Sequence, residues 1–109
     1  MITINLISPI LVGGERLLAI DIRPPSRAVV QRISAELDAK GQLPIHTVPG
    51  FAARLAGRSE STFAKLSEPD LLSVRKAVMT LHRREARRLR ARKVQRAART
   101  SSLLAREEA

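Results

Sequence analysis

The residues best suited to chemistry in this chain are basic ones, and they gather in its last third. Between residues 71 and 99 stand eleven Lys or Arg residues and a single acid, Glu85. Residues 1 to 70 hold eight basic and seven acidic residues, so nearly all of the net charge of +10 belongs to the later segment. Like charges at this density repel one another unless a negative surface lies against them. The segment therefore predicts a polyanionic partner.

Phosphate is the anion that these residues favour, because a guanidinium group makes paired hydrogen bonds to phosphate and to guanine. Duplex DNA is favoured over a single strand, since stacking on unpaired bases needs aromatic side chains and the chain has two Phe, no Trp and no Tyr. A groove of structured RNA remains an alternative. The predicted contacts to the nucleic-acid backbone are Arg83, Arg84, Arg87, Arg88, Arg90, Arg92, Lys93, Arg96 and Arg99.

A long helix from Ser67 to about Arg99 must position these side chains. Ser67 is a typical cap, and Pro69 and Asp70 suit a first turn. Its apolar positions fall on one stripe that also contains His82 and Glu85: Leu71, Val74, Val78, Leu81 and Leu89. Beyond Leu89 this apolar face of the helix becomes basic, so residues 90 to 100 are expected to protrude from the core. The alternative is a solvated helix end without a partner. Residues 101–109 are expected to form a flexible tail.

Residues 50 to 66, GFAARLAGRSESTFAKL, carry a second pattern. Ala53 lies on a first short helix, Gly57 stands at a turn, and Phe63 and Leu66 are apolar positions of a second helix. The segment resembles the helix-turn-helix signature of bacterial and phage regulators, except that Arg58 replaces the usual apolar residue. The resemblance implies that the second helix reads bases in the major groove. Its candidate base readers are Ser59, Ser61, Thr62 and Lys65. A structural corner beneath the long helix is the alternative.

The rest of the chain predicts an α+β fold. Alternation on both sides of Gly13-Gly14 predicts a β-hairpin from Ile2 to Ile22, with an edge or bend at Pro9. Further elements follow in order: a helix from Ser26 to Lys40, a third strand or extended chain from Gln42 to Val48, and short helices over Pro49–Ala56 and Ser59–Leu66. Residues 1–100 form one small domain, with a hairpin and helix portion (1–48), a helical portion (49–100) and a basic extension (83–99).

Other classes of function find little support. His46 and His82 stand alone, and His82 is interpreted as a packing residue rather than a ligand. Asp21, Glu36 and Asp38 could meet only by a coincidence of the fold. No Cys is present, and Gly13-Gly14 lacks the surroundings of a phosphate loop. We therefore expect no enzyme activity, no metal and no cofactor.

No membrane association is expected either. The N-terminus does not have the pattern of a signal peptide, and no apolar run approaches the roughly 20 residues of a membrane span. Residues 83 to 99 also lack the continuous apolar face of an interfacial helix. A cytoplasmic location is the resulting expectation.

These observations predict a small DNA-binding protein of a bacterial, phage or plasmid setting, acting as a regulator or an architectural factor. The apolar hairpin edge from Ile2 to Ile7 could pair with itself in a homodimer. One alternative is a phage-type interaction module or inhibitor, whose arginine helix docks on an acidic host protein. A second alternative is an RNA-binding factor.

Overall fold

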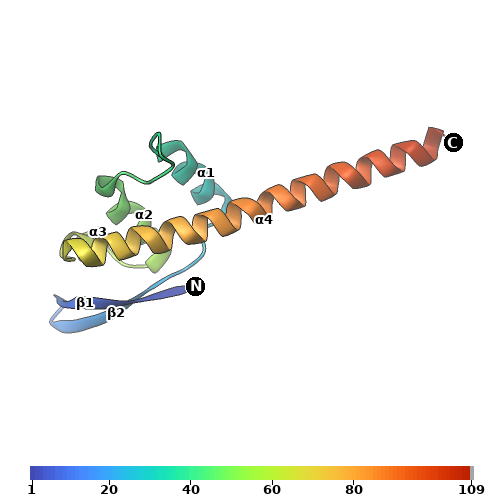
Figure 1. The fold of residues 1–109 in the computed structure, drawn as a ribbon. Coiled ribbons are helices and arrows are strands. Elements are labelled where there is room, and N and C mark those ends of the chain that lie inside the picture. The colour runs from blue at the N-terminus through green and yellow to red at the C-terminus, as the bar shows by residue number, and fades with distance from the viewer. Residues whose placement is uncertain (109) are drawn as a thin grey trace.

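A two-stranded hairpin and three short helices surround the first half of one long helix (Figure 1). The computed structural model describes the backbone of residues 1–108 and the side chains of residues 1–93. In chain order the elements are β1 (Ile2–Val12), β2 (Glu15–Ile22), α1 (Arg27–Glu36), a 3-10 turn (Ile45–Thr47), α2 (Val48–Ala56), α3 (Glu60–Ala64) and α4 (Glu68–Glu108). The predicted α+β class is confirmed. The second half of α4 extends away from the other elements, so the molecule measures 69 × 29 × 19 Å.

The hairpin is antiparallel, as predicted, but its first strand contains a large bulge. Asn5 pairs with Ala19, and the next recorded pair is Ile10 with Leu17. Residues 6–9 of β1 therefore face Leu18 alone. Pro9 lies in this bulge, where its missing N–H disturbs no strand pairing, so the predicted bend is confirmed.

The bulge also changes which side chains of β2 reach the core. Simple alternation places Leu18, Ile20 and Ile22 on one face, and Ile20 and Ile22 are indeed buried. Leu18, however, is 60% exposed, and Leu17 packs against the core instead. Leu18 lies opposite the bulge, and a bulge increases the local twist of a hairpin. This added twist explains why Leu17, and not Leu18, packs against the core.

Asp70 in the first turn of α4 binds the bulge. Its carboxylate accepts hydrogen bonds from the backbone N–H of Ile7 at 2.8 Å and of Ser8 at 3.0 Å. The Ser67 hydroxyl donates to the same carboxylate at 3.0 Å, and Ser67 Oγ accepts from the Asp70 N–H at 3.4 Å. Burial alone would raise the pKa of Asp70, but these hydrogen bonds outweigh it and hold the pKa below its ordinary value of 3.8. The cap of α4 and the bulge of β1 are thus one contact.

The connection between α1 and α2 differs from the prediction. α1 ends at Glu36, not Lys40, because the Asp38 carboxylate accepts the N–H groups of Lys40 and Gln42 and forms a turn. No third strand forms over residues 42–48. The helix predicted over Pro49–Ala56 forms as α2 and begins one residue earlier, with Pro49 in its first turn, where its missing N–H is tolerated.

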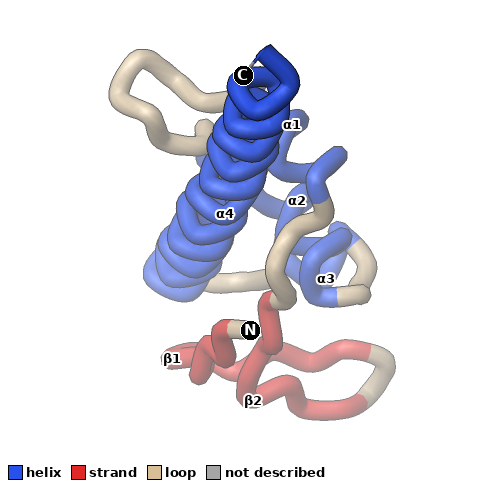
Figure 2. Tube along the Cα trace, turned by 90° about the vertical axis from the view of Figure 1, so that its right-hand side faces the viewer, coloured by secondary structure: helices blue, strands red, loops and turns tan. Residues whose placement is uncertain are grey.

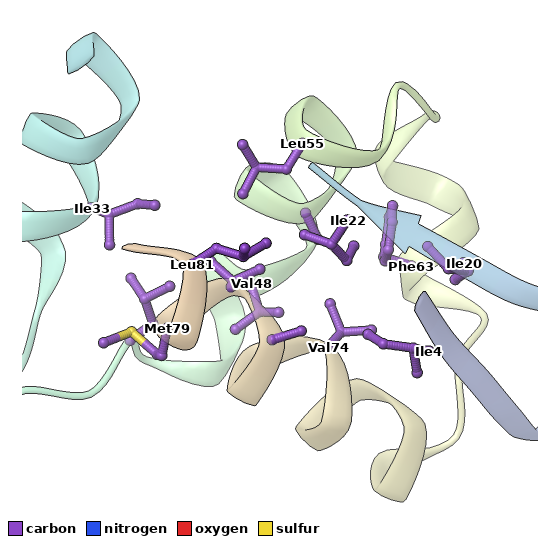
Figure 3. Close-up of a cluster of buried hydrophobic side chains, with 14 of the residues drawn as sticks. Ile4, Ile20, Ile22, Ile33, Val48, Leu55, Phe63, Val74, Met79 and Leu81 are labelled. Atoms are coloured by element: carbon purple, nitrogen blue, oxygen red, sulfur yellow. The ribbon is translucent and has the colours of Figure 1, made fainter. Parts of the chain in front are cut away.

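The core lies where the hairpin, α2 and α3 meet the first half of α4 (Figure 3). Phe63 is its one fully buried aromatic side chain among residues 1–93. The surrounding apolar side chains come from both strands and from α1, α2 and α4: Ile4, Ile20, Ile22, Ile33, Val48, Leu55, Val74, Met79 and Leu81. α4 continues past the predicted end near Arg99 to Glu108. The flexibility predicted for residues 101–109 is untested and stays a prediction.

Candidate nucleic-acid interface

The solvent face of α4 carries a continuous row of cations. Val74, Val78 and Leu81 face the core and are buried. At 100° per residue, four exposed cations fall within about 60° of one another on the opposite side. These four, called the basic stripe below, are Lys76, Arg83, Arg87 and Arg90. The stripe therefore begins on the part of α4 that packs on the core and continues onto the part that leaves it.

The stripe adds one residue to the predicted contacts. Lys76 belongs to the charged segment in the sequence, but it precedes the dense arginine run and was not among the predicted backbone contacts. Projecting α4 at 100° per residue would have found it, because Lys76 and Arg83 are seven residues, almost two full turns, apart. The sequence therefore indicated Lys76 by its spacing from Arg83 and not by the density of charges around it.

The described arginines of α4 are largely without acidic partners. Within residues 1–93 the one ion pair joins Arg88 Nη1 to Glu85 Oε1 at 3.7 Å, one turn apart on the helix surface. Such an exposed pair contributes little to stability, about 0–1 kcal/mol. The other predicted contacts with described side chains are exposed and make no ion pair within that range: Arg83, Arg84, Arg87, Arg90, Arg92 and Lys93. Arg96 and Arg99 lie on α4 outside the described side chains.

The apolar face of α4 stops shortly after His82. Among residues 1–93, Leu81 and His82 are the last buried residues, Leu89 is half-buried, and residues 90–93 are all exposed. This agrees with the prediction that the helix leaves the core near Leu89. Figure 2, which views the molecule from the side, shows α1, α2 and α3 on one side of the α4 rod and the hairpin below it.

His82 is a packing residue, as predicted, and its ring is only partly satisfied. Its Nε2 lies 3.0 Å from Ser34 Oγ, and the Ser34 hydroxyl donates to the Val30 carbonyl at 2.9 Å. Because that hydroxyl hydrogen is used, Ser34 accepts from the Nε2–H, and the buried Nδ1 has no hydrogen-bond partner. Burial lowers the pKa of His82 below its ordinary value of 6.5, and repulsion from Arg83 and Arg90 lowers it further. The Val30 carbonyl has the opposite effect but is outweighed.

The α2–α3 segment has the turn that the helix-turn-helix resemblance implies, with a short second helix. Gly57 ends α2 in the left-handed conformation at φ +64°, and Phe63 is buried. α3 has only five residues. Ser59, Ser61 and Lys65 are exposed.

Thr62 must be removed from the predicted base readers. Its side chain is 2% exposed, and its hydroxyl lies 3.1 Å from Ser59 Oγ. Its side chain points inward because Thr62 and Phe63 both lie on the side of α3 that packs on the core. A base edge cannot reach a hydroxyl that is buried in this way.

The structure does not bring the two predicted contact sets together. α3 lies beside the first turns of α4, whereas the dense arginines lie further along the same helix (Figure 1). Glu68 and Arg83 are fifteen residues apart, which is about 22 Å along a helix. Ser59 and Ser61 therefore belong to a different part of the surface from the dense arginines.

The acidic side chains singled out in the sequence have local partners or surroundings of their own. Within residues 1–93, no group of three His, Cys, Asp or Glu side chains could hold a metal ion. The Asp21 carboxylate accepts from the Thr3 hydroxyl at 2.6 Å and that of Asp38 is used in its turn, so the two are in separate places. Glu36 lines a cavity of about 550 Å³ between α1 and α2, where Arg32 and Arg54 are also found.

None of the described helices is both long and apolar enough to cross a membrane. Comparison of the chain with protein families, with curated proteins and with solved structures finds no match.

Proposed function

We propose that this protein binds duplex DNA through α4, whose basic stripe and flanking arginines contact backbone phosphates. The observation that supports this most directly is the set of exposed cations on α4 without an acidic partner among residues 1–93. Seven such side chains on one helix repel one another in the free protein. Phosphates relieve that repulsion.

The dimensions of the stripe suit a DNA strand. Lys76 and Arg90 are fourteen residues apart, about 21 Å along the helix axis. One DNA strand carries a phosphate for about every 3.4 Å of axial rise, so this length corresponds to roughly six phosphates. Beyond Leu89 the described residues Arg90, Arg92 and Lys93 project in different directions from the helix axis. That end of α4 suits the major groove, where phosphates lie on both sides of an inserted helix.

The function is that of a small regulator or architectural factor in a bacterial, phage or plasmid cytoplasm. The described interface favours binding that depends on the DNA backbone. If bases are read, exposed Ser59, Ser61 and Lys65 remain the candidates. Their distance from the dense arginines requires the DNA to reach from α3 to the second half of α4.

The test is a titration of labelled random duplex, followed by fluorescence anisotropy, from about 50 mM to about 200 mM salt. If about six phosphates are neutralised, the logarithm of the association constant falls against the logarithm of salt with a slope near −5. The variant Arg87→Gln/Arg90→Gln should reduce that slope by about two. The control Arg16→Gln/Arg27→Gln removes the same charge from exposed sites on β2 and α1. Absence of binding by the full chain at low salt refutes the proposal.

A second candidate function rests on the hairpin. Ile7, Leu11 and Leu18 are large apolar side chains that are 60–76% exposed. Exposed apolar side chains of this size favour a protein contact, either a second copy of the chain or a host protein. In that case α4 docks on an acidic protein surface. The same titration separates the two functions, because an interaction module shows no duplex binding at low salt. Competition with structured RNA identifies an RNA-binding factor.

A further inference from the structure

A second cavity lies on the solvent side of α4, where the helix still packs on the folded domain. Its volume is about 320 Å³, and six residues line it: Gln42, Leu72, Arg75, Lys76, Met79 and Arg83. Five of them come from α4 and one from the turn that follows α1. Two of them, Lys76 and Arg83, belong to the basic stripe.

The lining of this cavity is positively charged and contains no acid. Arg75, Lys76 and Arg83 all contribute to it, and none of them forms an ion pair with a carboxylate of residues 1–93. The larger cavity between α1 and α2 differs, because Glu36 and Glu60 line it together with two arginines. Three cations around one concave space repel one another, and a bound anion removes that repulsion.

The turn beside the cavity is held in place by its own hydrogen bonds. The Asp38 carboxylate accepts the Gln42 N–H at 3.0 Å, and the Asp38 N–H donates to the Gln42 carbonyl at 2.9 Å. The nearest acid in this turn is therefore occupied by the backbone. The side-chain amide of Gln42, which lines the cavity, can donate to an anion.

We propose that this cavity is a phosphate site on the folded domain, occupied by one phosphate of the DNA strand that follows the basic stripe. Arginine offers paired donors and lysine a compact charge, which together suit a phosphate group. Lys76 and Arg83 are seven residues apart, about 10.5 Å along the helix, so a strand along Arg83, Arg87 and Arg90 continues onto the cavity. The inference rests on the proposed function and adds an anchoring point within the core-packed part of α4.

The experiment measures duplex binding of the full chain by anisotropy in salt series. Arg75→Gln/Lys76→Gln should reduce affinity at about 50 mM salt by about tenfold and the slope by one to two. The variant Gln42→Glu places a carboxylate in the cavity and should weaken binding more than Gln31→Glu, which adds the same charge on the exposed surface of α1. Gln42→Glu leaves α4 unchanged, so it decides the matter if the double variant fails to fold.

The outcomes separate the two proposals. If the wild-type chain fails to bind duplex, the proposed function is wrong and this inference falls with it. If wild type binds but the cavity variants bind equally well with an equal slope, only the cavity assignment is overturned. The last measurement is a titration of the protein with inorganic phosphate. If it shifts the amide resonances of Gln42 and Lys76 while Gln42→Glu leaves duplex affinity unchanged, the site takes a free phosphate, and the assignment to a DNA strand is overturned.

Discussion

Replacing Asp70 with Ala tests how the hairpin is joined to α4. The change removes the acceptor of the Ile7 and Ser8 N–H groups and of the Ser67 hydroxyl, at 2.8, 3.0 and 3.0 Å. Hydrogen bonds to a charged group contribute about 1.5–3 kcal/mol each to stability. Water can reach the exposed bulge and partly replace the lost acceptor. We therefore expect a loss of about 3 kcal/mol, a large share of the 5–15 kcal/mol typical of a domain.

Urea unfolding at neutral pH, followed by far-UV circular dichroism, measures this loss. The midpoint should fall with little change in the dependence on urea, since the same surface is exposed on unfolding. Ser67→Ala is the control: it removes the cap and one hydrogen bond and should cost about 1 kcal/mol. If Asp70→Ala costs no more than Ser67→Ala, the carboxylate does not join the hairpin to the helix and the reasoning is wrong.

Acid provides an independent check of the same contact. The pKa of Asp70 is lower in the folded protein than its ordinary value of 3.8, so the ionised carboxylate stabilises the fold. This contribution is complete above pH 3.8 and is lost as the pH falls through the folded pKa. The difference in stability between wild type and Asp70→Ala should shrink over that acid range.

Three further predictions concern the fold that presents α4. The pKa of His82 is lowered by burial, so wild-type stability should decline as the pH falls below 6.5, and His82→Gln should lose that decline in urea midpoints at about pH 7.5 and about pH 5.5. Gly57→Ala, at φ +64° with open space around a new Cβ, should destabilise by about 1–2 kcal/mol, whereas Gly50→Ala inside α2 should be neutral or stabilising. The melting temperature should fall in Gly57→Ala and should rise or stay unchanged in Gly50→Ala. Phe63→Ala removes a fully buried ring and should cost about 3–5 kcal/mol in urea unfolding, and a cost near zero would contradict its place in the core.

Local patterns predicted the elements that depend on local chemistry. Alternation and Gly13-Gly14 are enough for a hairpin, and Ser67 followed by an apolar stripe is enough for a long helix. The end of the core-packed part of α4 near Leu89 also follows from spacing alone, because it depends only on which residues share a helix face. The shortage of acids in the same segment agrees with the single ion pair that α4 makes within residues 1–93.

Features that depend on distant residues could not be predicted from local patterns. The bulge over residues 6–9 is bound by Asp70, more than sixty positions later, and nothing near Pro9 indicates that partner. Thr62 has the polar side chain of a typical surface residue, and it is buried only because α3 packs on the core. The cavity that includes Gln42 and Arg75 depends on where the turn after α1 meets α4. Each of these requires the tertiary arrangement.

The continuity of α4 has a mechanical consequence. Residues 71 to 99 contain neither Gly nor Pro, the usual causes of a sharp kink, so the helix is a stiff spacer. Asp70 and Arg90 are twenty residues apart, about 30 Å along the axis. If α4 binds a duplex as proposed, bending forces on the arginine end would be transmitted along the rod to the joint at Ile7 and Ser8. A molecule held by the hairpin would be kept at a fixed separation from the DNA.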